Sequence, residues 1–112
     1  MFRISQLLTT LTHDKPVPPK VKMPGPVVIW NLIRRCNLSC RHCYSTSLDI
    51  DFKDELSTEQ IKATIDDLKV AHVPVIIFSG GEPLLRPDIF EITAYAKAKG
   101  FYVALSTNGT LI

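Results

Sequence analysis

The feature that most constrains the fold of this chain is an alternation of short apolar runs with longer stretches of helical spacing. The apolar runs cover residues 27–33, 75–78 and 101–105, and the first, rich in β-branched residues, has the composition of a strand buried on both faces. Two stretches with helix-forming patterns separate them. Strands that alternate with helices predict an α/β fold in which the strands are parallel and the crossovers right-handed.

Both expected helices have recognisable ends. Ser57 followed by Gln60 is a capping box that predicts the start of the first helix, and Pro87 suits the first position of the second. Gly100 predicts the end of the second helix, because glycine readily adopts the left-handed conformation found there. The expected buried stripes are Ile61, Ile65 and Leu68 in the first helix and Ile89, Ile92 and Ala96 in the second.

Residues 1–26 have a different composition, and we predict that they form a separate N-terminal segment. Residues 1–12 carry apolar side chains at helical spacing, which predicts a short amphipathic helix that packs on the domain, with a membrane or targeting role as the alternative. Residues 15–26 hold five of the eight prolines and should form an extended linker, because proline lacks an amide donor. Residues 27–112 then supply three βα units of a single domain.

The predicted sheet is incomplete as a domain. Three parallel strands in this order leave two open edges and one uncovered face, which a finished domain would not tolerate. The sequence also ends soon after a polar turn at residues 106–110. We therefore expect a truncated sequence that provides roughly the first half of a barrel.

Bulk properties narrow the classes of partner. A net charge of +2 is too small to favour nucleic acid or an anionic membrane. No apolar run approaches the roughly 20 residues that a membrane span requires, and Thr9, Thr10 and Thr12 interrupt any signal-peptide core. The chain is therefore expected in the cytoplasm, where thiols stay reduced and available for metals or catalysis.

All three cysteines lie in a polar loop directly after the first strand. Cys36, Cys40 and Cys43 have a C-x3-C-x2-C spacing, and an odd number of clustered thiols fits a metal site better than a disulfide framework. Soft thiolates select zinc or iron–sulfur clusters. Three thiolates on a four-iron cube would leave one iron open, whereas a structural zinc site formed by the three thiols and His42 is the competing interpretation.

The other two strands are also followed by polar, glycine-containing loops. Gly80-Gly81-Glu82-Pro83 ends the second strand, and Ser106-Thr107-Asn108-Gly109-Thr110 follows the third. Because reactive loops of parallel sheets lie at the carboxyl ends of the strands, we expect these loops and the cysteines to share one edge. An ordinary tight turn remains the alternative for each glycine-containing loop.

Together these motifs resemble the radical SAM superfamily, whose members bind S-adenosylmethionine (SAM). Its C-x3-C-x-φ-C motif matches the cysteine loop, and its GGEP motif appears literally after the second strand. The resemblance implies a partial (β/α)6 TIM-like barrel in which Cys36, Cys40 and Cys43 hold a [4Fe–4S] cluster. It further implies SAM contacts from His42, Gly80, Gly81, Glu82, Ser106 and Asn108.

The roles implied for these SAM contacts differ. The region around His42 would contact the adenine. The two glycines would let the backbone approach the ligand closely, and Glu82 would receive the methionine ammonium group. Ser106 and Asn108 would contact the ribose or the carboxylate. The implied chemistry is reductive cleavage of SAM to methionine and a 5′-deoxyadenosyl radical that removes a hydrogen atom from substrate.

The flanking residues are similar to those of superfamily members that modify tetrapyrrole side chains. Residues 26–35, 79–90 and 105–111 carry this likeness, which is greatest toward enzymes of heme d1 biosynthesis. It implies removal of propionate groups from didecarboxysiroheme, with a small electron donor such as flavodoxin or ferredoxin. Heme decarboxylation, peptide modification and a non-catalytic, cysteine-rich metal-binding module are the alternatives.

Charged residues surround the cysteine loop. Arg34, Arg35 and Arg41 could offset the charge of the thiolates, pair with substrate carboxylates, or simply be solvated. The acidic residues that follow, Asp49, Asp51, Asp54 and Glu55, are expected to be exposed.

Overall fold

A computed structural model describes residues 25–112, and the predicted amphipathic helix and most of the proline-rich linker lie outside these residues. The order of elements alternates strands with helices, as predicted, with one added 3-10 turn. The elements are β1 (Val27–Ile33), α2 (Thr58–Val70), β2 (Val75–Gly80), the 3-10 helix η1 (Pro83–Leu85), α3 (Ile89–Ala98) and β3 (Tyr102–Leu105).

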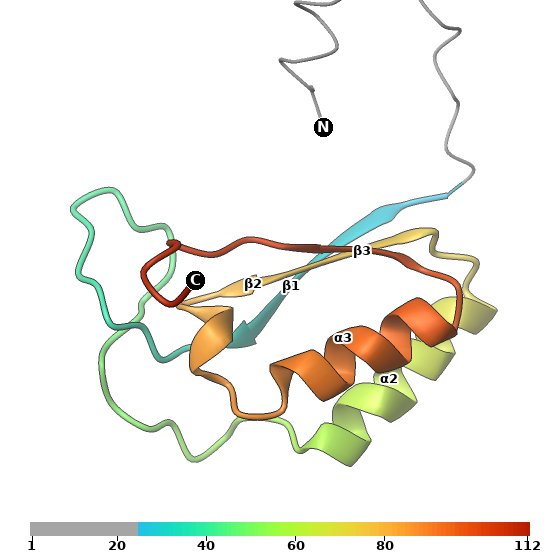
Figure 1. The fold of residues 1–112 in the computed structure, drawn as a ribbon, viewed down its shortest axis with the longest axis horizontal. Helices are drawn as coiled ribbons and strands as arrows, with labels where there is room; N and C mark the ends of the chain where they lie inside the picture. The colour runs from blue at the N-terminus through green and yellow to red at the C-terminus, as the bar shows by residue number, and fades with distance from the viewer. Residues whose placement is uncertain (1–24) are drawn as a thin grey trace, which may run out of the picture.

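The three strands form one parallel sheet in the order β1-β2-β3. Val75 of β2 pairs with Val27 of β1 on one side and with Tyr102 of β3 on the other. Both helices cover the same face of the sheet (Figure 1). The loops that follow the carboxyl ends of the strands gather at one end of the sheet, away from the start of β1. The α/β prediction is therefore confirmed, and the arrangement matches part of a TIM-like barrel.

The core lies between the sheet and the two helices. Alternate residues of the strands point into it, including Leu32, Ile76 and Phe78. Ile61, Ile65, Ile89, Ile92 and Ala96 meet them from the helices, as predicted, and Leu68 packs partly buried at the margin. Each fully buried isoleucine or phenylalanine contributes about 1.5–3 kcal/mol, so this layer stabilises the described part.

The prediction that the first strand is buried on both faces is wrong for this structure. Ile29 is 66% exposed and Val27 is 49% exposed, because among residues 25–112 no helix or strand covers the face away from α2 and α3. The apolar composition of β1 reflects two different faces. Val28 and Trp30 pack on the core, while Ile29 faces an open surface.

The helix ends agree with the sequence patterns in two of three cases. Ser57 and Gln60 form the capping box, with the Gln60 N–H donating to Ser57 Oγ at 3.3 Å and the Ser57 N–H to Gln60 Oε1 at 2.8 Å. Gly100 has φ +86° after α3. The second helix begins at Ile89 rather than at Pro87, because η1 and an ion pair occupy the residues before it.

That ion pair, between Arg86 and Asp88, was not anticipated from the sequence. The guanidinium donates from Nε and Nη2 to the two Asp88 carboxylate oxygens at 2.8 and 2.9 Å. The same guanidinium donates to the Leu56 carbonyl at 3.0 Å, and Thr58 Oγ1 donates to Asp88 at 2.6 Å. Arg86 and Asp88 therefore join the start of α2 to the start of α3 in a nearly buried position.

No helix in the described part of the chain has the length and apolar character needed to cross a membrane.

The Arg86–Asp88 pair predicts how stability depends on pH. The Arg86 hydrogen bonds, and to a smaller extent that of Thr58, lower the pKa of Asp88 from 3.8 to about 2. The ionised carboxylate therefore stabilises the fold above pH 4, and this contribution disappears as the pH falls toward 2. We expect Asp88→Asn to lower the free energy of unfolding at pH 7 by about 2 kcal/mol, with a smaller deficit at pH 2.

Urea unfolding at several pH values, followed by Trp30 fluorescence, checks this prediction. Asp67→Asn alters an exposed carboxylate on α2 and should change the free energy of unfolding by no more than about 0.5 kcal/mol. An Asp88→Asn deficit of equal size at pH 7 and pH 2 would contradict it.

Candidate cofactor site at the carboxyl edge of the sheet

The structure brings the three predicted loops together at the carboxyl edge of the sheet. The Gly81 N–H donates to the Ile33 carbonyl at 2.7 Å, and the Glu82 N–H donates to the Arg35 carbonyl at 2.9 Å. These two bonds join the loop after β2 to the segment that leads into the cysteines. The third loop arrives through Asn108, whose side-chain nitrogen lies 2.9 Å from Asn37 Oδ1.

The two glycines are required by the chain's own backbone. Gly80 has φ +131°, and a Cβ there would lie 2.2 Å from the Ile33 carbonyl oxygen. A Cβ on Gly81 would lie 2.2 Å from the Arg35 carbonyl oxygen. Real Cβ atoms do not approach backbone oxygens this closely, so any side chain at either position would push β1 and β2 apart. The sequence predicts that these glycines let a ligand approach the backbone. In the structure they let the segment around Ile33 and Arg35 approach it.

The three cysteines occupy two environments. Cys36 is 8% exposed and its N–H donates to the Leu48 carbonyl at 3.2 Å, whereas Cys40 and Cys43 are exposed. A turn closed by the Cys43 N–H and the Cys40 carbonyl, at 3.1 Å, holds the two exposed cysteines together. All three thiols are free of disulfides.

These thiols suit an iron–sulfur cluster by their chemistry rather than by a preformed geometry. Among residues 25–112, no three His, Cys, Asp or Glu side chains are close enough together to hold a metal ion. The donor set nevertheless consists of three thiols on one short loop, of the kind that soft metal centres use. His42 is exposed between Cys40 and Cys43. The candidate ligands thus lie on a loop beside the other two motifs.

Glu82 is fully buried, and its carboxylate faces its own chain. Oε1 accepts the Leu84 N–H at 2.9 Å, and Oε2 accepts the Asn108 N–H at 2.7 Å. Thr107 Oγ1 lies 2.8 and 2.9 Å from the two oxygens and donates to them. Thr107 is not among the site residues predicted from the sequence, where its only signal is its place inside the Ser-Thr-Asn-Gly-Thr loop.

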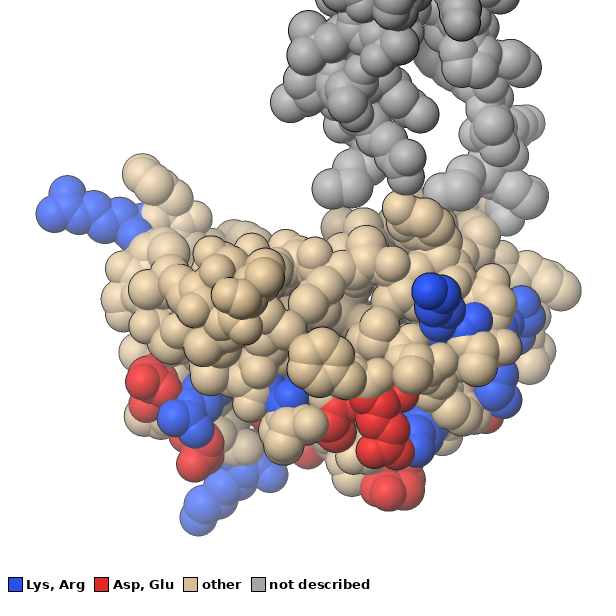
Figure 2. Space-filling model, in the orientation of Figure 1, with Lys and Arg blue, Asp and Glu red and all other residues tan. Residues whose placement is uncertain are grey.

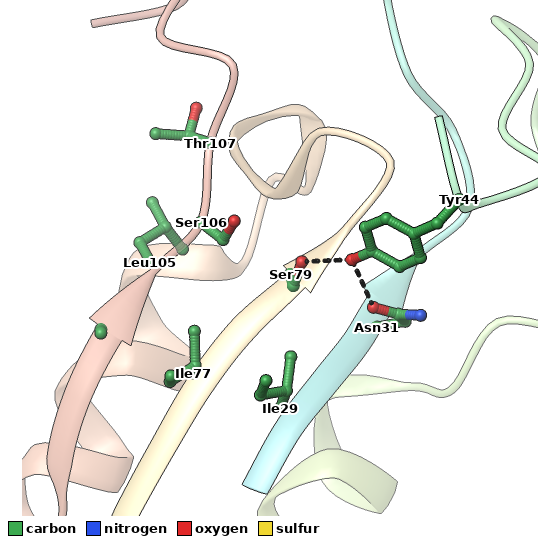
Figure 3. A pocket seen from close by; sticks show the side chains of 9 residues that line it. Ile29, Asn31, Tyr44, Ile77, Ser79, Leu105, Ser106 and Thr107 are labelled. Atoms are coloured by element: carbon green, nitrogen blue, oxygen red, sulfur yellow. Dashed lines mark hydrogen bonds between the residues drawn. The ribbon is translucent and has the colours of Figure 1, made fainter. Parts of the chain in front are cut away.

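A cavity of about 620 Å³ opens on the uncovered face of the sheet, next to these loops. Ile29, Ile77 and Leu105 supply apolar surface, and Ser106 lies at the end of β3 beside them (Figure 3). Tyr44, the residue after Cys43, extends across the ends of β1 and β2. Its hydroxyl lies 3.0 Å from Ser79 Oγ and donates to Asn31 Oδ1 at 3.3 Å. The cavity therefore has an apolar floor and a polar rim.

The charges near the cysteine loop are mostly paired. Arg35 binds Asp49 at 2.8 Å and Asp51 at 2.7 Å, and the hydrogen bond that Arg35 Nε donates to Asp49 is the largest influence that raises the pKa of Arg35. The Arg34 guanidinium lies 4.2 Å from the centre of the Phe52 ring. Arg35 is therefore engaged by the acidic segment, while Arg41 is exposed between Cys40 and His42. Figure 2 shows acidic and basic side chains intermingled along one side of the molecule.

Comparison with known proteins decides the family. The family model described as the radical SAM superfamily matches residues 30–112. This chain belongs to the radical SAM superfamily. Its members are enzymes that use a [4Fe–4S] cluster and SAM, so both cofactors inferred from the motifs are those of the family.

Several curated relatives are similar over most of this chain. It is 52% identical over 112 residues to pre-heme d1 synthase of Dinoroseobacter shibae, covering 98% of this chain and 27% of that protein. It is 60% identical over 87 residues to Fe-coproporphyrin III synthase of Methanosarcina barkeri, covering 78% and 22%. It is 40% identical over 108 residues to mycofactocin maturase of Mycolicibacterium smegmatis, covering 91% and 27%. The chain thus spans about a quarter of the length of these relatives.

The close contact between Gly81 and the Arg35 carbonyl predicts that a single added methyl group at Gly81 strongly destabilises the fold. Gly81→Ala places a Cβ against the Arg35 carbonyl oxygen, and we expect it to cost about 3 kcal/mol of stability and to move the cysteine loop. Thermal unfolding together with iron content after anaerobic reconstitution measures both effects.

Gly109→Ala is the matched control, because nothing lies within 4 Å of its added Cβ. Its φ of +77° alone should cost about 1 kcal/mol, and iron content should stay at the parent level. Equal losses of stability and iron content in the two variants would show that the contact with the Arg35 carbonyl is not what makes glycine necessary at position 81.

Proposed function

We propose that the protein containing this chain is a radical SAM enzyme whose cluster is held by Cys36, Cys40 and Cys43, and whose substrate is a tetrapyrrole. The observation that carries the proposal is the meeting of three loops at one edge. The cysteine loop, the Gly80–Glu82 segment and the Asn108 loop are joined there by direct hydrogen bonds. A radical SAM site needs these three motifs within reach of one small cofactor.

A [4Fe–4S] cluster has four irons, and three cysteines can bind three of them. The fourth iron would then be free for SAM. When bound, the cluster and SAM supply the reductive cleavage that produces methionine and a 5′-deoxyadenosyl radical, which removes a hydrogen atom from substrate. The burial of Cys36 excludes water from one side of the site. The exposure of Cys40 and Cys43 leaves the other side open to a small electron donor such as flavodoxin or ferredoxin.

We propose that SAM lies along the rim of the cavity at the strand ends. Ser106 lines this cavity and is exposed at the end of β3, where its hydroxyl is available for the ribose or carboxylate. Asn108 lies beside Cys36 and would contact the same groups, and His42 would contribute to adenine binding.

The Gly80–Glu82 segment is the fourth part of this proposed binding site. We propose that the backbone of Gly80 and Gly81 contacts SAM. The proposed contact of Glu82 with the methionine ammonium group would have to share a carboxylate that already accepts hydrogen bonds from Leu84, Thr107 and Asn108.

The substrate proposal comes from the relatives and from the cavity. Two relatives are named as synthases of tetrapyrroles, pre-heme d1 and Fe-coproporphyrin III. An apolar floor flanked by polar groups suits a flat macrocycle with polar side chains. We propose the removal of propionate side chains from didecarboxysiroheme, in heme d1 biosynthesis, as the reaction. Free thiols and an oxygen-sensitive cluster favour the cytoplasm as its location.

A second candidate is the modification of a peptide. It is favoured by 40% identity over 91% of this chain to mycofactocin maturase. A heme decarboxylase is a third, favoured by the proteins named AdoMet-dependent heme synthase, one of which is 44% identical over 86 residues. The substrate assay below separates them.

The cluster assignment predicts the behaviour of the full-length protein. After anaerobic reconstitution it should be brown, and dithionite should start the formation of 5′-deoxyadenosine from SAM. Cys36→Ala, Cys40→Ala and Cys43→Ala should each abolish that product, because each removes one of three ligands. Ser39→Ala, an exposed neighbour, should retain it. A colourless protein that carries zinc and cleaves no SAM would overturn the proposal.

The substrate assignment is tested separately by mass spectrometry. Incubation of the active full-length protein with didecarboxysiroheme should yield a product that has lost propionate groups. Conversion of Fe-coproporphyrin III in its place would establish the heme decarboxylase alternative. Turnover of neither tetrapyrrole, with SAM cleavage intact, would contradict the tetrapyrrole proposal and leave the maturase alternative.

A further inference from the structure

The buried carboxylate of Glu82 accepts its hydrogen bonds from its own chain. A carboxylate offers about four acceptor positions. Leu84 N–H and Asn108 N–H take one each, and the Thr107 hydroxyl is shared between the two oxygens. With 0% of Glu82 exposed, this carboxylate binds the backbone and side chains of the loop after β3. It therefore determines where Asn108 stands.

The orientation of the Asn108 side chain is determined by a second set of contacts. Asn108 Oδ1 accepts the Thr110 N–H at 2.9 Å and the Thr110 hydroxyl at 2.8 Å. The amide nitrogen must then point the other way, toward the cysteine loop. There it donates to Asn37 Oδ1 at 2.9 Å and lies 3.9 Å from Cys36 Sγ.

Asn37 closes the arrangement by donating from Nδ2 to Thr110 Oγ1 at 2.8 Å. The two asparagines and Thr110 thus hold one another across the two loops. Of the two hydrogens on the Asn108 amide nitrogen, one serves Asn37 and the other faces the sulfur of the least exposed cysteine. An N–H directed at a thiolate sulfur stabilises negative charge on that sulfur.

We propose that Glu82 is a positioning residue which, through Thr107 and Asn108, aims the Asn108 amide at Cys36 and thereby raises the reduction potential of the cluster. Hydrogen bonds to ligand sulfurs are one of the determinants of iron–sulfur potentials, because they favour the reduced and more negative state. The inference rests on the proposed function only in requiring that Cys36 is a cluster ligand. It gives this loop a role that operates before SAM binds.

The test is a redox titration of the reconstituted full-length protein without SAM, followed by the electron paramagnetic resonance signal of the reduced cluster. Asn108→Leu removes the donor and should shift the midpoint potential to a more negative value. Thr107→Val removes the hydroxyl that holds Glu82 and should shift it in the same direction. Thr107→Ser keeps the hydroxyl and should restore the parent potential.

The double variant Thr107→Val/Asn108→Leu shows whether Thr107 acts through Asn108. It should have the potential of Asn108→Leu alone, because the second change removes the group that the first one displaces. Iron content and circular dichroism confirm that each variant retains its cluster and fold. Because Asn108 is exposed, Asn108→Leu keeps the test decisive if Thr107→Val does not fold.

Unchanged potentials in Asn108→Leu, with a full cluster present, would overturn the inference and leave the proposed function intact. A parent protein that holds no [4Fe–4S] cluster would remove both. Additive shifts in the double variant would show that Thr107 affects the cluster by a route other than Asn108, which also contradicts the proposal.

Discussion

Two backbone hydrogen bonds organise this molecule, from Gly81 to Ile33 and from Glu82 to Arg35. They occur where β2 ends and β1 turns into the cysteine loop, and they require two consecutive residues without a Cβ. This crossing fixes the position of Cys36 relative to the second loop. It also turns the Glu82 side chain into the interior, where the carboxylate accepts hydrogen bonds from Thr107 and Asn108 of the third loop. The site thus depends on how closely two strands approach one another.

The two faces of the sheet have different surroundings. One face is packed by α2 and α3, whose starts are joined by Arg86 and Asp88. The other face carries Ile29, Asn31 and Ser79 and opens into the cavity beside the loops. Tyr44 connects this face to the cysteines, because it follows Cys43 in sequence and binds Ser79 and Asn31. A packed layer therefore supports the loops that we propose hold the cofactor.

Much of this arrangement could be predicted from local sequence patterns. The parallel order, the capping box at Ser57 and the left-handed Gly100 depend on residues close together in the chain. The burial of β1 was predicted wrongly, because an apolar strand has the same composition whether its second face is covered or open. The roles of Arg86, Thr107 and Tyr44 were missed, since each depends on partners that only the fold brings near. The SAM contacts stay predictions, as does the ligation of iron by the cysteines.

In the structure proposed for the intact enzyme, three cysteines and two neighbouring loops hold a four-iron cluster with one iron open to SAM. Mössbauer spectroscopy of the full-length protein reconstituted with iron-57 tests this most directly, because it distinguishes iron sites by their ligands. We predict that added SAM changes the spectrum of one iron out of four and leaves the other three unchanged. Four irons that do not respond to SAM, or a protein that takes up no iron, would contradict the claim.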